Sequence, residues 1–206
     1  MVFPSLDLEQ KLWNTGYSRI CGLDEVGRGS FAGPVVVGAV VFLKDSLLPD
    51  GIADSKLLNP LRRQKLAEEI KKCALNWSIA EIGVAVINKV GIGRATQMAF
   101  RRAIKLLDKS PDFVLIDAFY IKHFNRKNQQ AVKDGDTKCI SIAAASIIAK
   151  VYRDKLMRRL HQKYPKYGFA KHKGYGTKKH QEAIRINGLS KIHRKSFDLG
   201  KYILRT

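Results

Sequence analysis

The sequence predicts an α/β domain with a mixed sheet, and three observations predict it. Two apolar segments, 18–26 and 33–43, come first and are separated by a glycine-rich turn, as expected for neighbouring strands. Beyond them, strand and helix patterns alternate. The 206 residues, of which 45% are hydrophobic, are enough for one domain with a substantial core.

The first half of the chain is expected to contain three strands and two helices. The two leading segments pair as strands, and residues 44–59 form a loop. A helix starts at Pro60, because apolar residues recur at helical spacing after it. The segment 77–87, WSIAEIGVAVI, predicts the third strand, and the next helix is expected over 94–107.

The second half of the chain contains the longest predicted helix. DFVLID, residues 112–117, predicts a short buried strand, and 130–133 a further one. A helix is expected over 140–164, with a first half of small apolar residues that lets it lie close to a sheet. A loop rich in Gly, Lys and Tyr follows, and then a short helix near 178–187.

The charge is high and unevenly distributed. The net charge is +20, and from Lys150 onwards 17 Lys and Arg residues stand against only 3 Asp and Glu. Nucleic acid is the commonest partner of such a chain, and an anionic membrane surface the next. We therefore expect a single domain over 1–206, with a core over about 1–160 and a basic, substrate-binding C-terminal part over about 161–206.

The compartment is predicted to be the cytoplasm. The N-terminal segment lacks the pattern of a signal peptide, and the longest apolar runs are too short to span a bilayer. Three cysteines without a CxxC pair fit reduced thiols. We expect no membrane association and a monomer.

Four acidic residues lie at or near the predicted strand ends. Asp24 and Glu25 end the first strand, Asp117 ends another, and Asp136 precedes the long helix. Strand ends of open α/β sheets gather at one edge, where sites form. Clustered carboxylates repel one another unless they hold a divalent metal, and hard oxygen ligands favour Mg²⁺ or Mn²⁺. The alternative is that each acid is an ordinary cap or turn residue.

The turn after the first strand, GRGSFA, formally matches a dinucleotide-binding fingerprint. That fingerprint requires a helix next, whereas a strand follows here, and the two neighbouring acids would repel a pyrophosphate. Arg28, between Gly27 and Gly29, instead predicts a loop with backbone N–H groups that can approach a sugar or phosphate. A plain tight turn with an exposed arginine is the alternative.

The segment HKGYGTKKH offers cations around an aromatic ring. Its lysines can contact phosphates, and Tyr175 can stack on a base or sugar. A solvated basic loop would have the same composition. His172 and His180 lack metal-ligand spacing, so we expect them to be phosphate contacts or surface residues.

With these features placed, the chain resembles the ribonuclease HII family, the type 2 ribonucleases H, from about residue 18 to about 198. The motifs that carry the resemblance are LDEVGRG (23–29), AGPVVVGAVVF (32–42), DSKLL (54–58), VLID (114–117), DGD (134–136), IAAASIIAKVYRD (142–154), YGFAKHKGYGT (167–177) and HRKSF (193–197).

The resemblance implies a ribonuclease H-like fold, with a five-stranded mixed sheet flanked by helices and a small helical C-terminal part. It implies an endonuclease that cleaves RNA in RNA:DNA hybrids and incises 5′ to single ribonucleotides embedded in duplex DNA. Two divalent ions, Mg²⁺ or Mn²⁺, would assist hydrolysis to 3′-OH and 5′-phosphate ends.

The resemblance also assigns residues. The family's four metal-site acids correspond to Asp24, Glu25, Asp117 and Asp136, and Asp154 of the YRD motif is a rival for the fourth. The substrate-binding residues are expected to be the glycine-arginine-glycine element, the stacking tyrosine and nearby basic residues: Gly27, Arg28, Gly29, Lys56, His172, Lys173 and Tyr175.

Three positions depart from the family pattern. Ser30 stands where proline is usual, Leu57 where a second lysine is usual, and Ala118 where glycine is common. Leu57 leaves Lys56 as the only cation of its stretch, which puts phosphate affinity there in doubt. The segment 197–206 has no clear sliding-clamp motif, so we expect no clamp partner.

Two other function classes stay open at this point. A proofreading-type exonuclease would need free ends and ignore the 2′-OH. A non-catalytic nucleic-acid-binding module would need no divalent ion, although the acids at strand ends argue against it. A type 3 ribonuclease H would usually carry an N-terminal substrate-binding domain, for which the roughly 17 residues before the first strand leave no room.

Overall fold

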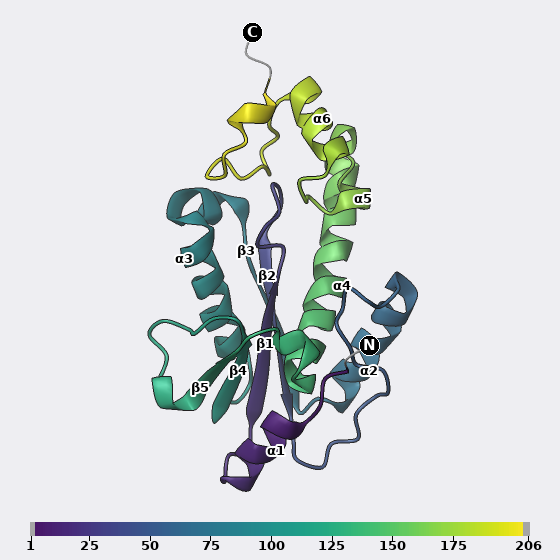
Figure 1. Ribbon diagram of the computed structural model, residues 1–206. Coiled ribbons are helices and arrows are strands. Elements are labelled where there is room, and N and C mark those ends of the chain that lie inside the picture. The colour runs from purple at the N-terminus through teal and green to yellow at the C-terminus, as the bar shows by residue number, and fades with distance from the viewer. Residues whose placement is uncertain (1–2, 204–206) are drawn as a thin grey trace.

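A five-stranded twisted sheet organises the chain in the computed structural model, which describes residues 3–203 (Figure 1). The strand order is β3-β2-β1-β4-β5. The strands are β1 (Ile20–Val26), β2 (Val35–Phe42), β3 (Asn76–Ile82), β4 (Phe113–Asp117) and β5 (Gln129–Val132).

Strand direction places the ends of β1 and β4 at one edge. β1 runs parallel to β4 and β4 parallel to β5, whereas β2 is antiparallel to both of its neighbours. The sheet is therefore mixed, as predicted. The carboxyl ends of β1, β4 and β5 lie together, and the chain carries its predicted acids to that edge.

Helix α4 (Ile140–Lys163) lies directly on one face of the sheet. A Cβ placed on Gly22 of β1 would lie 2.1 Å from the backbone of Ser141, and one on Gly38 of β2 would lie 2.3 Å from the carbonyl oxygen of Ala145. Only glycine permits this approach. The small residues at the start of α4 thus have the role that their sequence predicted.

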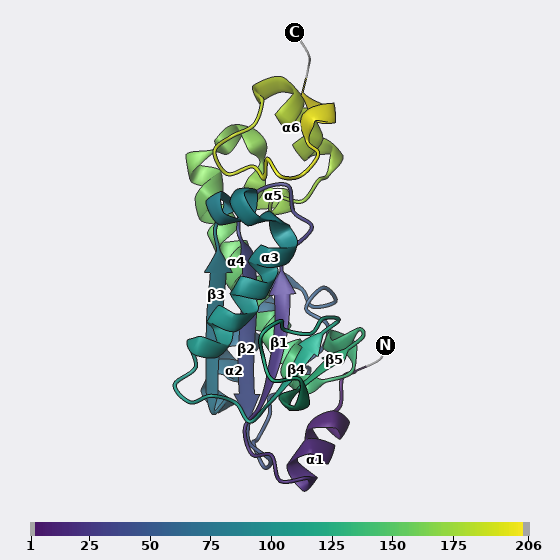
Figure 2. The ribbon, with the colours of Figure 1, turned by 90° about the vertical axis from the view of Figure 1, so that its left-hand side faces the viewer.

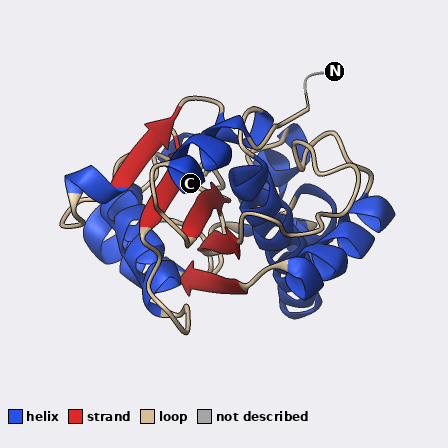
Figure 3. Cartoon of the chain, turned by 90° about the horizontal axis from the view of Figure 1, so that it is seen from below, coloured by secondary structure: helices blue, strands red, loops and turns tan. Residues whose placement is uncertain are grey.

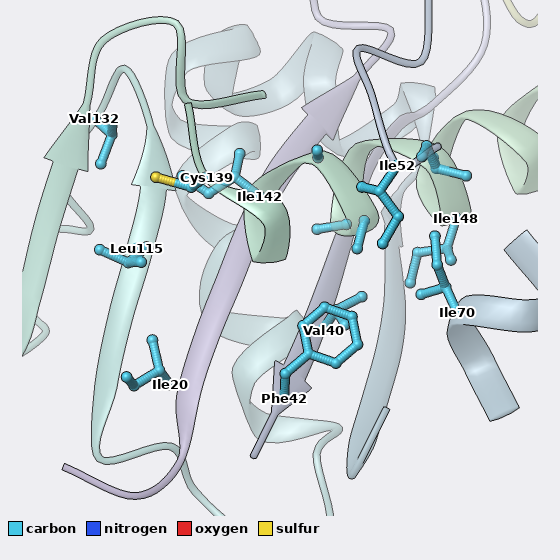
Figure 4. Packing of buried hydrophobic residues seen from close by; sticks show 14 of the residues in the cluster. Ile20, Val40, Phe42, Ile52, Ile70, Leu115, Val132, Cys139, Ile142 and Ile148 are labelled. Atoms are coloured by element: carbon cyan, nitrogen blue, oxygen red, sulfur yellow. The ribbon is translucent and has the colours of Figure 1, made fainter. Parts of the chain in front are cut away.

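The opposite face is covered by α3 (Val84–Lys105), so that the sheet lies between helices (Figures 1 and 3). Each face has its own hydrophobic cluster. On the α4 face, Ile142 and Ile148 pack with Leu115 and Val40 of the strands and with Ile70 of α2 (Pro60–Cys73) (Figure 4).

The C-terminal part lies beyond the end of the sheet at which β1 ends (Figure 2). It contains the short α5 (Phe169–His172), α6 (Lys178–Asn187) and 3-10 turns at Pro165–Tyr167 and Gly200–Tyr202. A small cluster that includes Met157 and Phe169 joins it to the end of α4. Within residues 3–203, no helix has the length and apolarity needed to cross a membrane.

Two predictions about elements were wrong. The third strand ends at Ile82, and VAVI begins α3 instead of extending the strand. Gly83 is the N-cap, and Gly91, with φ of 77°, interrupts the helix one turn before the helical pattern that the sequence displays. The segment after α4 was predicted to be a loop, but it includes the short helix α5.

One helix was not predicted. In α1 (Asp7–Asn14), the fully buried Glu9 accepts hydrogen bonds from the backbone N–H and the hydroxyl of Ser141, at 2.9 and 2.7 Å. This carboxylate caps the start of α4. The N-terminal segment thereby fixes the helix end that carries part of the site.

Candidate active site

The four predicted acids line one cavity of about 460 Å³ at the sheet edge. Adjacent strand residues face opposite sides, so Asp24 lies on the α4 side with Gly22, and Glu25 on the α3 side with Leu23. Asp117 ends β4. Asp136 lies in a 3-10 turn, Gly135–Thr137, just before α4. The structure therefore brings together all four residues that the sequence singled out.

Asp117 also builds the turn that carries Asp136. Its Oδ1 accepts a hydrogen bond of 2.8 Å from the backbone N–H of Gly135. A Cβ on Gly135 would lie 2.7 Å from Ile142 of α4, so the turn sits tightly against the helix. One carboxylate thus positions the next.

The cavity disfavours negative charge. Burial raises the pKa of Asp24 well above its usual range, and the charges of Glu25, Asp117 and Asp136 raise it further. Burial raises the pKa of Glu25 to about 7, although Arg28 opposes the shift. The pKa of Asp117 is raised by burial and by Asp136. Charged acids at this edge require a compensating cation.

Part of that compensation comes from Lys56. Its Nζ lies 3.2 Å from Asp136 and 3.7 Å from Asp54, while 74% of its side chain stays exposed. Arg28 approaches Glu25 at 3.9 Å, but the Glu25 Oε2 atom is buried and has no hydrogen-bond partner among residues 3–203. An oxygen in this state is available to a ligand cation.

The donor set fits a hard divalent ion. Four carboxylates with one unpartnered buried oxygen are ligands of the kind that Mg²⁺ and Mn²⁺ bind. Within the described part of the chain, however, no three acidic, His or Cys side chains stand close enough together to ligate an ion as placed here. Metal binding would require these side chains to converge.

The rival acid Asp154 does not reach this cavity. It forms ion pairs with Lys150 at 2.7 Å and Arg63 at 3.7 Å, further along α4. Asp136 lines the cavity instead. The sequence argument that Asp154 lies too deep in the helix agrees with this placement.

Three further polar residues of the cavity were missed: Ser55, Ser146 and Lys150. The Ser55 and Ser146 hydroxyls are 3.0 Å apart and buried. Ser146 and Lys150 are four residues apart on α4, so they share one helix face. The four-residue spacing of Ser146 and Lys150, close to the start of the helix, was the sequence signal that could have placed them in the cavity.

Arg28 borders two cavities. Besides the carboxylate cavity, it lines a groove of about 630 Å³ between α3 and the loop after β4, and its guanidinium lies 4.3 Å from the centre of the Phe119 ring. We call this the α3 groove. Its cations are Arg28, Arg94, Arg101 and Lys122, and no acid among residues 3–203 lines it.

The other predicted substrate residues are divided. Gly27, Lys56 and Tyr175 line the carboxylate cavity with Arg28, whereas Gly29, His172 and Lys173 do not. His172 is half-buried and its Nε2 bonds to the carbonyl oxygen of Tyr167 at 2.7 Å.

The prediction that His180 is a phosphate contact or surface residue was wrong. His180 is fully buried and is paired with His193, with their Nε2 atoms 3.0 Å apart. Its histidine and lysine neighbours in sequence made it look like part of a basic loop.

Two departures from the family pattern have local consequences. Ala118 has φ of 59°, a left-handed conformation that costs a residue with a Cβ about 1–2 kcal/mol and explains why glycine is common there. The Ser30 N–H donates to the carbonyl oxygen of Gly27 at 3.3 Å, which proline could not do.

Comparison with known proteins decides the family. The family model for Ribonuclease HII matches residues 21–199. The chain belongs to the ribonuclease HII family. It is 50% identical to the Ribonuclease HII of Chloroherpeton thalassium over 194 residues, covering 93% of this chain and 95% of that protein. It is 47% identical to that of Caldicellulosiruptor bescii over 191 residues, covering 93% and 92%.

Solved structures agree on the fold. The ribonuclease H2 of Pyrococcus horikoshii OT3 has a TM-score of 0.72 at 24% identity and covers 89% of this chain and 95% of its own. The RNase HII of Archaeoglobus fulgidus, solved in complex with PCNA, has a TM-score of 0.69 at 25% identity, covering 85% and 92%. The predicted ribonuclease H-like fold is confirmed.

Membership of the ribonuclease HII family makes this chain a nuclease of the class that hydrolyses RNA in RNA:DNA hybrids, as the resemblance predicted. Metal dependence is general to that family. A structure of Bst-RNase HIII was solved with Mn²⁺. The absence of a clamp partner stays a prediction, and residues 204–206 of the segment on which it rests lie outside the described residues.

Proposed function

We propose that this ribonuclease acts both on RNA:DNA hybrids and on duplex DNA with single embedded ribonucleotides, which it incises on their 5′ side. The observation that carries the proposal is the shared cavity. Four acids suited to divalent metal line it together with Gly27, Arg28 and Tyr175. A phosphate at the acids would therefore lie beside a backbone loop and an aromatic ring suited to a sugar and a base.

The acids are proposed to hold the metal. Two Mg²⁺ or Mn²⁺ ions, when bound, would supply an activated water for in-line attack and stabilise the departing 3′ oxygen. Asp24 is the shared ligand in this proposal, and Glu25, Asp117 and Asp136 complete the sites. The products carry 3′-OH and 5′-phosphate ends.

Lys56 and Arg28 are proposed to orient the scissile strand. Both approach cavity acids in the structure and keep much of their side chains exposed, so both can turn to a phosphate oxygen when metal neutralises the acids. Tyr175, 37% exposed, presents a ring at the cavity mouth for stacking at the ribo-to-deoxy step. Base identity plays no part, because the 2′-OH and the duplex shape distinguish the substrate.

Two basic surfaces are proposed to hold the duplex. One is the C-terminal part, residues 161–206, with the exposed Lys163, Lys166, Lys171, Lys178 and Lys179. The other is the α3 groove, which continues from the carboxylate cavity through Arg28. Contacts of this kind are to phosphates, so affinity should fall steeply with salt.

A cut-site assay tests the function. End-labelled duplex DNA with one ribonucleotide is incubated with and without Mg²⁺ or Mn²⁺, beside an all-DNA duplex of the same sequence. We expect one metal-dependent nick 5′ to the ribonucleotide and none in the control. Equal degradation of both duplexes would favour an exonuclease, and binding without cutting would favour a non-catalytic module.

A further inference from the structure

Two arginines are fully buried behind the loop of residues 27–29, which we call the glycine loop. Arg153 of α4 and Arg194 both have 0% exposure, and neither forms an ion pair within residues 3–203. Their guanidinium groups instead donate to backbone carbonyl oxygens, three for each arginine. Burying a cation is costly unless hydrogen bonds compensate for the lost water, and here each guanidinium nitrogen donates to one carbonyl oxygen.

Arg194 is bonded to the loop that carries Arg28. Its Nη2 donates to the carbonyl oxygen of Gly27 and its Nη1 to that of Arg28, both at 2.7 Å, while Nε donates to Gly33 at 3.0 Å. The two η nitrogens thus hold two successive peptide groups. Arg194 lines neither the carboxylate cavity nor the α3 groove, so the loop separates it from both.

Those bonds fix where the loop N–H groups point. In a planar trans peptide, the carbonyl oxygen and the N–H of the next residue point in opposite directions. Because the Gly27 and Arg28 carbonyls point to Arg194, the N–H groups of Arg28 and Gly29 point away from it. Neither N–H has a hydrogen-bond partner within the described chain. Both remain free to donate to a substrate.

The loop leaves little freedom for another orientation. Gly27 has φ of 87°, and a Cβ there would lie 2.0 Å from Nε of Arg153. The loop is thus packed against one arginine and hydrogen-bonded to the other. Burial and the nearby Arg153 lower the pKa of Arg194 to about 9, so the side chain is still charged at neutral pH. The positive charge strengthens its hydrogen bonds to the carbonyl oxygens.

We propose that Arg194 is a positioning residue for ribonucleotide recognition: by holding the Gly27 and Arg28 carbonyls, it presents the N–H groups of Arg28 and Gly29 to the sugar 2′-hydroxyl. The inference rests on the proposed function, since it requires that this loop read the 2′-OH. It gives the C-terminal part a second role besides holding the duplex, because Arg194 belongs to that part.

The residue before Arg194 acts on the other substrate element. The Ser190 N–H donates to Nδ1 of His193 at 2.8 Å, so the proton of this neutral ring lies on Nε2, which donates to Nε2 of His180. His180 Nδ1 then donates to the carbonyl oxygen of Tyr175 at 2.9 Å. One segment therefore sets the spacing between the glycine loop and the Tyr175 loop.

Arg153 provides a control for the hydrogen bonds to the loop. It is equally buried and packs against Gly27, but its three carbonyl partners belong to Ala32, Pro34 and Lys173 and not to the Gly27 and Arg28 peptides. Arg153→Lys and Arg194→Lys should lower thermal stability to a similar extent. Only Arg194→Lys, with one amine in place of the fork, should release the loop N–H groups.

The test is a binding ratio that needs no turnover. Dissociation constants are measured with Ca²⁺ in place of Mg²⁺, with absence of cutting checked, for a duplex with one ribonucleotide and for its all-DNA equivalent. We expect the ratio of all-DNA to ribonucleotide constants to fall about fivefold in Arg194→Lys, the value of one lost hydrogen bond. It should stay within twofold of the parent in Arg153→Lys.

The outcomes separate the two proposals. A parent protein that binds both duplexes equally contradicts the proposed function. A parent that discriminates, with Arg194→Lys discriminating as well as the parent, overturns the positioning role. If Arg194→Lys shows no cooperative unfolding transition, amide exchange in the parent decides: protection of the Arg28 and Gly29 N–H groups by the ribonucleotide duplex alone supports the role, and equal protection by both duplexes overturns it.

Discussion

The carboxylate cavity differs from the segment behind the glycine loop, which contains His193 and Arg194, in how buried charge is stabilised. In the cavity, like charges gather, and burial and mutual repulsion raise the pKa values of Asp24 and Asp117. Behind the loop, Arg194 has a carbonyl oxygen for each of its three nitrogens. A cation that enters the cavity should therefore stabilise it further, whereas Arg194 is hydrogen-bonded through all three nitrogens without a ligand. Ligand-dependent stability should reside in the cavity.

Among the tests of this comparison, the variant Asp24→Asn should have the largest effect. We expect cleavage to fall at least about 1,000-fold, because the proposed shared metal ligand is lost, while duplex binding is kept. Without divalent ions, removing one of four repelling acids should raise the melting temperature by about 2–4 °C. Activity and thermal unfolding, each with and without Mg²⁺, measure both effects.

Asp154→Asn is the matched control for that variant. Asp154, on α4, is also a buried acid, but it is paired with Lys150 and Arg63. Its loss should lower the melting temperature and leave most of the cleavage activity, since it does not line the cavity. Cleavage that survives in Asp24→Asn would remove the metal-site assignment.

Acidification should separate the two regions by the sign of their effect. Burial lowers the pKa values of His180 and His193 to about 4. Between pH 4 and 6.5 the unfolded chain binds more protons at these histidines than the folded chain does, so folding is weakened as the pH falls. Each should cost roughly 2 kcal/mol between pH 7.5 and 5. The raised pKa of Glu25, about 7, has the opposite sign.

The histidine effect is measured by urea unfolding from pH 7.5 to 5. The groups facing the pair are the stacked ring of His172, which disfavours a second positive charge, and Tyr167, neutral in this range. The variant His193→Gln should lose about half of the acid-induced destabilisation. An unchanged slope in His193→Gln would contradict the prediction.

The next effect is on substrate choice at the cavity mouth. Tyr175→Ala should reduce single-ribonucleotide incision by about 10- to 100-fold, the range for loss of one stacking contact, and cleavage of long hybrids less. Tyr175→Phe keeps the ring and should retain both activities. Initial rates on the two substrates give the ratio. Equal losses on both would argue against a role at the ribo-to-deoxy junction.

The sequence predicted the cavity better than the segment behind the loop. Asp24 and Asp117 end apolar strands, and acids in that position indicate a site because strand ends share an edge. Arg194 and His180 gave no such signal. In sequence they belong to a basic, solvated-looking tail, and only the packing of α6 and the glycine loop around them buries their side chains. The composition of a basic segment does not show which of its basic side chains are exposed and which are buried.

The error in the predicted end of the third strand has a related cause. VAVI at 84–87 is apolar, and its three β-branched residues, Val84, Val86 and Ile87, favour a strand locally. In the structure they form the first turn of α3, because Gly83 caps a helix and Ile87 is buried against the sheet. Tertiary packing overrides a local preference that is worth less than one buried side chain.

The smallest expected effect concerns the α3 groove, which we propose to hold phosphates together with the C-terminal part. Arg94 is exposed on α3 and lines this groove. If one phosphate binds it, Arg94→Gln should weaken binding to every duplex alike and reduce the slope of log affinity against log salt by about 1. Lys11→Gln, on α1 at the opposite end of the sheet, is the control and should leave the slope unchanged (Figure 2). A slope unchanged in both variants would confine the duplex to the C-terminal part, and a loss limited to ribonucleotide substrates would make the groove part of 2′-OH recognition.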